Sequence, residues 1–124
     1  MTERPEPRGD RAPGWFEVAR SADVGGSRPL AVQCLGRDLV CYRGFSGQVH
    51  VIDGFCPHMG VSFARHGIIE GEGITCRYHG WNWDGEGRNT CVPTQRRPMA
   101  IFNLRSYPVR LTDGRVLVQL DPEP

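Results

Sequence analysis

Short apolar runs separated by turn residues dominate the pattern of this chain. Runs rich in Val, Ile, Leu and aromatic residues alternate at short intervals with clusters of Gly, Asp and Asn. No window keeps the three-to-four-residue spacing of an amphipathic helix, and apolar runs bounded by turn residues are typical of strands. The pattern therefore predicts an all-β fold. We expect strands near residues 15–19, 30–35, 39–43, 49–52, 101–109 and 116–120.

Turn signals connect these runs into hairpins. Gly-rich turns at 36–38 and 44–47 join the early strands, and the turn at 112–115 joins the last two. Residues 21–23 read Ser-Ala-Asp, which favours one helical turn and nothing longer. We therefore expect a small antiparallel β-sandwich as the base of the fold.

The middle of the chain has a different character. Residues 54–87 contain eight glycines and two further hairpin signals, at 70–73 and 84–87. We expect an inserted subdomain over about 54–92 within a single domain at 14–122. The polar, Pro- and Arg-rich residues 1–13 are expected to form a disordered tail.

Composition limits the partners. The formal net charge is +1, so no excess of one sign favours nucleic acid or an anionic membrane. No apolar run has the roughly 18 residues needed to span a bilayer, and the first residues do not resemble a signal peptide. We therefore expect a cytoplasmic protein with neither nucleic acid nor membrane as a partner.

Two motifs carry the candidate chemistry. Cys56-Pro57-His58 and Cys76-Arg77-Tyr78-His79 form a C-x-H and a C-x-x-H pair, separated by seventeen residues. Two thiolates and two imidazoles are the ligand set of a Rieske-type [2Fe-2S] cluster, in which the cysteines bind one iron and the histidines the other. We expect one such cluster per chain, bound by Cys56, His58, Cys76 and His79.

A structural zinc site is the alternative for any set of two cysteines and two histidines. Zinc fingers usually pair two cysteines in one knuckle and two histidines in the other, whereas each motif here mixes the two types. The other three cysteines, Cys34, Cys41 and Cys91, are expected to pack as small apolar residues. An odd total of five argues against a disulfide framework.

Residues beside the motifs are expected to support the cluster. Gly60 and Gly80 allow a close backbone approach, so that N–H groups face the bridging sulfides. Pro93 lies in a segment expected to fold over as a third covering loop. Met59 and Trp81 are expected either to form part of a docking face or to shield the cluster.

The chain resembles the Rieske domain of bacterial Rieske non-haem iron oxygenases. The resemblance rests on residues 53–60 and 76–81, which hold the two motifs, and extends to the opening segment 14–19 and the hairpin 81–88. The segments 104–109 and 120–123 are most similar to the ketosteroid-hydroxylase and cholesterol-desaturase branch. The resemblance implies the Rieske fold and a Rieske [2Fe-2S] cluster.

This family resemblance also implies partners. A reductase supplies one electron, and an oxygenase or another iron-containing acceptor receives it. Such oxygenases activate dioxygen at a separate mononuclear iron, bound by two histidines and a carboxylate on a following catalytic domain. The only histidines of this chain outside the two motifs are His50 and His66, and no carboxylate has the spacing of such a site to both. We therefore expect a ferredoxin-like component, not a complete oxygenase; the alternative is the electron-entry domain or split subunit of an oxygenase lacking its catalytic domain.

Overall fold

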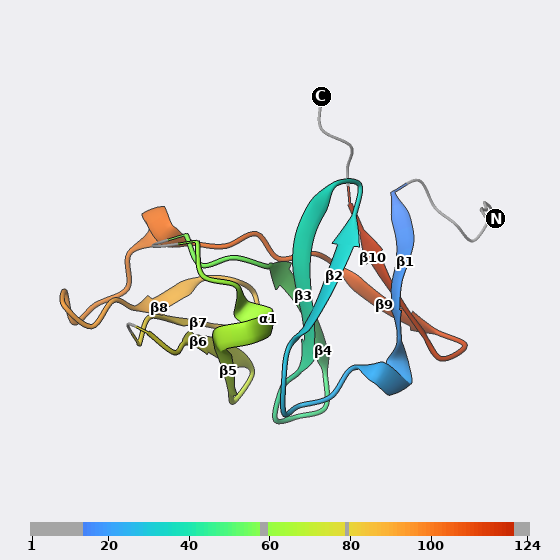
Figure 1. The fold of residues 1–124 in the computed structure, drawn as a ribbon, viewed down its shortest axis with the longest axis horizontal. Helices are drawn as coiled ribbons and strands as arrows, with labels where there is room; N and C mark the ends of the chain where they lie inside the picture. The colour runs from blue at the N-terminus through green and yellow to red at the C-terminus, as the bar shows by residue number, and fades with distance from the viewer. Residues whose placement is uncertain (1–13, 58–59, 79, 121–124) are drawn as a thin grey trace.

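The computed structural model describes residues 14–57, 60–78 and 80–120, which form three antiparallel sheets (Figure 1). The sheet orders are β1-β10-β9, β2-β3-β4 and β5-β6-β7-β8. The strands are β1 (Trp15–Arg20), β2 (Leu30–Cys34), β3 (Arg37–Arg43), β4 (Val49–Asp53), β5 (Gly67–Glu70), β6 (Gly73–Cys76), β7 (Asn82–Trp83), β8 (Asn89–Cys91), β9 (Val109–Thr112) and β10 (Arg115–Gln119). The helical turns are η1 (Ser21–Asp23), α1 (Phe63–His66) and η2 (Ala100–Phe102).

The sheet β2-β3-β4 is the middle layer of the molecule. Along β3, Leu39 and Cys41 pack into a core shared with β1 and β10. The intervening residues, Val40 and Tyr42, pack into a second core against the sheet β5-β6-β7-β8. Because successive side chains of a strand point to opposite faces, a strand covered on both faces is buried without interruption. Residues 39–42 are accordingly all 1% exposed or less.

The two outer layers thus use opposite faces of one sheet. Figure 1 shows β1, β9 and β10 on one side of β2-β3-β4 and the sheet β5-β6-β7-β8 on the other. The first pair of layers is the expected antiparallel sandwich base, and the third sheet lies within the segment that the sequence indicates as an insertion. The all-β prediction is confirmed. Within the described residues no helix has the length and apolar character to cross a membrane.

Most predicted elements are present with small shifts of their ends. The turn at 21–23 is helical as expected, and the hairpins at 70–73 and 112–115 form. The sequence did not predict α1, a single turn between the two motifs. The tail predicted over 1–13 lies outside the described residues.

The predicted strand over 101–109 is wrong. Residues 100–102 form η2 instead, and β9 begins only at Val109, directly after Pro108, which has no backbone N–H to donate. Between them the backbone bonds to several elements in turn. Leu104 donates its N–H to Gly87 O, Arg105 O accepts from Asp53 N–H, and Tyr107 donates to Val51 O. This segment therefore crosses from the third sheet to the middle sheet, where residues 105–107 meet β4 in an isolated bridge and do not form a continuous strand.

Glu72 joins three hairpin turns at the boundary between the middle and third sheets. Its Oε2 accepts the Ser46 N–H at 2.8 Å, and its Oε1 lies 2.8 Å from His50 Nε2. The buried Tyr42 hydroxyl donates to the Glu72 carbonyl oxygen at 3.0 Å. A Cβ on Gly85 would lie 2.5 Å from His50 Cε1, so the third turn must carry glycine here. The hydrogen bond with His50, followed by those from Ser46, lowers the pKa of Glu72.

Acid should weaken the contacts of the Glu72 carboxylate with Ser46 and His50. Because the folded-state pKa of Glu72 lies below its ordinary value of 4.5, the carboxylate stabilises the fold fully above that pH and loses this effect as the pH falls through the lowered pKa. We expect Glu72→Gln to lower the urea midpoint near neutral pH, with a difference from the wild type that shrinks in acid. Glu17→Gln, which removes one 3.6 Å contact with Arg115, is the control with a smaller difference. A difference in urea midpoint between Glu72→Gln and the wild type that stays constant down to acid pH would show that the charge of the Glu72 carboxylate does not stabilise the fold.

Close packing of the third sheet gives a second prediction. A Cβ on Gly73 would overlap the Trp83 carbonyl oxygen of the neighbouring strand, and backbone cannot move aside as a side chain can. We expect Gly73→Ala to lower the free energy of unfolding by about 2 kcal/mol or more. Gly25→Ala, where nothing lies within 4 Å of the added Cβ, should change it by less than about 0.5 kcal/mol. Equal effects in denaturant titrations would show that this contact is relieved at little cost.

Candidate metal centre

The two motif loops have the same backbone hydrogen-bond pattern. In the first loop Cys56 N–H donates to Val61 O at 2.8 Å, and Gly60 N–H donates back to Cys56 O at 2.7 Å. In the second loop Cys76 N–H donates to Trp81 O and Gly80 N–H donates to Cys76 O, both at 2.9 Å. Each cysteine thus begins a closed loop that ends five residues later.

Glycine is required at the same position of both loops. Gly60 has φ +72° and Gly80 has φ +70°, and each follows its cysteine by four residues. This left-handed backbone is strained for residues that carry a Cβ. Both glycine N–H groups close their loops, and the expectation that N–H groups beside them face the bridging sulfides stays a prediction.

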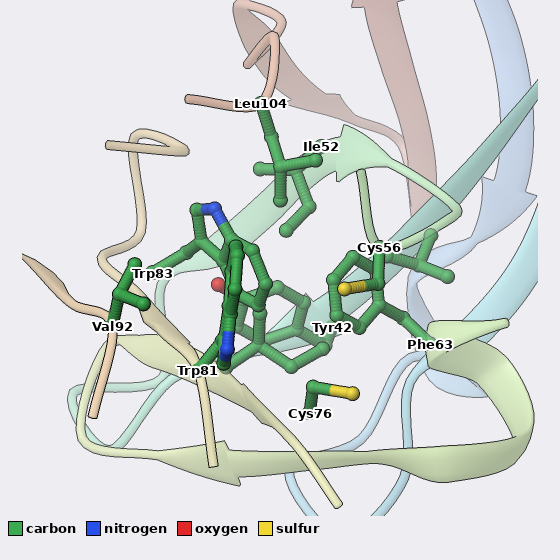
Figure 2. Close-up of a cluster of buried hydrophobic side chains, with 11 residues drawn as sticks. Tyr42, Ile52, Cys56, Phe63, Cys76, Trp81, Trp83, Val92 and Leu104 are labelled. Carbon is green, nitrogen blue, oxygen red and sulfur yellow. The ribbon is translucent and has the colours of Figure 1, made fainter. Parts of the chain in front are cut away.

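Cys56 and Cys76 are buried in one apolar cluster. Each is 1% exposed, and Figure 2 shows both thiols among the side chains of this core. The aromatic members include Tyr42, Phe63 and Trp83. The five cysteines, all within the described part of the chain, form no disulfide. Two buried thiols at the heads of matching loops fit the thiolate half of a [2Fe-2S] ligand set.

His58, Met59 and His79 lie outside the described residues. The structure therefore brings together two of the four expected ligands, Cys56 and Cys76. Among residues 14–57, 60–78 and 80–120 no group of three side chains is placed to hold a metal ion. The fit to a cluster rests on the two loops and their cysteines.

Trp81 belongs to an aromatic layer beneath the second loop. Trp81 is 7% exposed. Its ring centroid lies 4.8 Å from the ring centroid of Phe102 and 6.3 Å from that of Trp83. Trp83 donates its indole N–H to Phe102 O at 2.9 Å, and its ring meets Phe63 edge-on at 5.2 Å. Trp81 therefore shields the core at this point, and little of its surface is available for docking.

Pro93 lies against the second loop. A Cβ on Gly80 would be 3.6 Å from Pro93 Cγ, which is ordinary van der Waals contact. The segment that carries Pro93 is a tight turn, closed by Val92 N–H donating to Arg97 O at 2.9 Å. Val92 is 2% exposed and anchors this turn in the same core as the two cysteines.

The remaining cysteines are placed away from this core or at its edge. Cys34 and Cys41 lie in the base core, as expected. Burial raises the pKa of the Cys41 thiol to about 12, so it stays protonated at neutral pH, as expected of a cysteine that packs as an apolar residue. Cys91 is partly exposed on β8 and belongs to neither core.

The two described histidines have local partners. His50 contacts Glu72, as described above, and the His66 ring lies 4.9 Å from the Tyr78 ring. Sequence reasoning missed the role of Glu72. The Glu-Gly-Glu-Gly pattern at 70–73 indicates a turn, and nothing in it points to the distant partners Ser46 and His50.

Comparison with known proteins agrees with this geometry. The model of the Rieske [2Fe-2S] domain family matches residues 14–108. The oxygenase component of 3-ketosteroid-9-alpha-monooxygenase from Rhodococcus rhodochrous is 35% identical over 112 residues, covering 90% of this chain and 29% of that protein. Cholesterol 7-desaturase from Ciona intestinalis is 30% identical over 105 residues, covering 85% of this chain and 22% of that protein.

A solved structure shares the fold as well. Apo dicamba monooxygenase superposes with a TM-score of 0.79 at 28% identity, covering 87% of this chain and 34% of that one. The chain thus spans less than a third of the length of the two curated relatives. Matching loops, paired buried thiols and a family match over residues 14–108 lead to one conclusion: this chain belongs to the Rieske [2Fe-2S] domain family.

Proposed function

We propose that Cys56, His58, Cys76 and His79 bind one Rieske [2Fe-2S] cluster per chain. The observation that carries this proposal is the equivalence of the two loops, each of which begins at a buried cysteine and closes through a left-handed glycine. Thiolates at matching positions of two loops can hold one iron, and the histidines of the same motifs can hold the other. The family match supports this ligand set.

The function that follows is one-electron transfer within an oxygenase or oxidoreductase system. The bound cluster supplies a reversible one-electron couple. The chain's own residues supply a dry pocket, since Trp81, Trp83 and Phe63 exclude water behind the cysteines. Pro93 and its turn cover the second loop from the outside. Burial of this kind favours the less charged state of a redox centre and keeps thiolates from oxidation.

The partners are an electron-donating reductase and an iron-containing acceptor of the oxygenase type. The relatives at 30–35% identity are an oxygenase component and a desaturase, which supports an acceptor of that class. The chain acts either as a ferredoxin-like component or as the electron-entry part of such an oxygenase. In both cases the ligand-loop end of the third sheet is where electrons are exchanged, and we place this exchange in the cytoplasm.

Cysteine variants test the ligand set. We expect Cys76→Ser to abolish the brown colour and the electron paramagnetic resonance signal of the dithionite-reduced protein, because a serine oxygen replaces a thiolate ligand. Cys91→Ser, the same change on β8 of the third sheet, should keep both. A colourless wild-type protein that contains zinc would contradict the cluster. A signal that survives in Cys76→Ser would contradict the assignment of this ligand.

Glycine variants test the loop geometry. Gly60 and Gly36 have φ +72° and +77°, and nothing lies within 4 Å of a Cβ added to either. Alanine at each position should therefore cost about the same, roughly 1 kcal/mol of stability. We expect only Gly60→Ala to shorten the lifetime of the bound cluster, followed by the loss of visible absorption in air. Equal lifetimes in the two variants would show that the closed loop is not needed to hold the cluster.

A further inference from the structure

Charge is distributed unevenly between the ligand-loop end and the rest of the chain. Residues 54–69, 73–83 and 89–109, which form the loops and strands around the two motifs, contain no Asp or Glu. They contain five arginines: Arg65, Arg77, Arg96, Arg97 and Arg105. The rest of the chain holds the other ten arginines with all fourteen carboxylates, a net formal charge of −4. A chain with a formal charge of +1 thus has a cationic end.

Four of these arginines are exposed and have no carboxylate partner among the described residues. They are Arg65, Arg77, Arg96 and Arg97, here called the arginine face. Two arginines outside this face have carboxylate partners. Arg88 contacts Asp84 and Glu86, and Arg115 lies 3.6 Å from Glu17. Unpaired guanidinium groups keep their full charge available for an external carboxylate.

Contacts between segments bring the arginine face together around the second motif loop. Arg77 N–H donates to His66 O at 3.0 Å, which fixes α1 and its Arg65 beside that loop. Pro93 also lies against this loop, at Gly80. Figure 1 shows α1, the third sheet and the segment after β8 on the side of the middle sheet away from β1, β9 and β10.

The backbone at Arg96 is unusual. Its φ is +55°, a left-handed conformation in which glycine is favoured. Arg96 N–H donates to Val92 O at 2.8 Å and also contacts Pro93 O at 3.2 Å, so the conformation is held by the closed turn. The exposed side chain makes no recorded contact within the described residues. The left-handed backbone at Arg96 lowers the stability of the fold, and no side-chain contact of Arg96 within the described residues offsets this strain, which points to a role outside the chain.

Exposed apolar side chains accompany these charges. Tyr78, directly after Arg77, is 58% exposed, and Ile101 in η2 is 80% exposed. Aromatic and aliphatic anchors mixed with arginine are typical of protein interfaces. Nucleic-acid surfaces need a larger basic excess than four arginines on a chain of net charge +1.

We propose that the arginine face docks the acidic surface of the protein that exchanges electrons at the ligand loops. This inference rests on the proposed function and adds the chemistry of the partner: clustered Asp and Glu side chains around its own redox centre. Opposite charges raise the association rate and orient the encounter, and salt screens both effects. Four cations around one loop orient such a partner with its redox centre toward the cluster.

Two forms of one acceptor protein provide the test. Native cytochrome c is basic, and succinylated cytochrome c carries carboxylates in place of its lysine amines, with the same haem. One electron passes from the reduced holoprotein to each ferric haem, which becomes ferrous without proton transfer. We expect the succinylated form to be reduced about tenfold faster at an ionic strength of about 0.01 M than at about 1 M. The native form should show no such decrease.

Variants assign this salt effect to the arginine face. The double variant Arg96→Gly and Arg97→Gln should slow reduction of the succinylated form at least about threefold at low salt. Its thermal midpoint should not fall, because glycine relieves the left-handed strain at position 96. Arg28→Gln removes an exposed arginine from the loop before β2 and should leave the rate within about 30% of the wild type.

Three results would overturn the proposal. The first is reduction of the succinylated form by the double variant at the wild-type rate. The second is an equal slowing of that reduction by Arg28→Gln. The third is binding of a single-stranded oligonucleotide to the holoprotein at about 0.1 M salt that the double variant abolishes. The electron paramagnetic resonance signal of each sample separates these outcomes from failure of the proposed function. A wild-type protein without that signal refutes the cluster itself, whereas intact signals with equal rates refute only the docking surface.

Discussion

The closure of each motif loop on its own cysteine is the constraint on which the candidate centre depends. In each loop the cysteine N–H donates to the carbonyl oxygen of the residue five positions later. The cysteine carbonyl oxygen accepts the N–H of the glycine four positions later. This pair of bonds fixes the backbone of each loop around its cysteine, which limits the positions open to the thiol. The histidine spacing differs between the motifs, whereas the glycine spacing does not. The shared element is therefore the loop, and the histidines are fitted into it.

The middle sheet supports these loops from behind. Because β3 is buried on both faces, Tyr42 contacts the ligand-side core while its neighbour Cys41 packs into the base. The two cores consequently cannot move independently of the strand that they share. Glu72 adds a polar connection at the far end of the β5–β6 hairpin, through Ser46 and His50. Packing and hydrogen bonding together join the third sheet to the middle sheet.

The sequence predicts what depends on local pattern and misses what depends on long-range contacts. The hairpins and the helical turn at 21–23 follow from turn residues, and the family follows from two short motifs. The strand expected at 101–109 fails because its apolar residues pack into the core from an irregular segment whose hydrogen bonds are divided between the turn after β7 and β4. The role of Glu72 is equally invisible, since its partners lie 22 to 30 residues away in sequence. The sequence leaves Trp81 either in a docking face or as a shield beside a ligand, and its burial in the tertiary structure favours the shield.

We propose that these two loops hold a pair of irons, with thiolates on one and imidazoles on the other. Pulsed electron paramagnetic resonance of the dithionite-reduced protein measures this directly, because the unpaired electron senses the nitrogen nuclei bound to the reduced iron. We expect the unpaired electron to couple to two histidine nitrogens, and one of these couplings should be lost in His79→Cys. A reduced cluster without strong nitrogen couplings would mean ligation by cysteine alone, and the assignment of both motifs would be wrong.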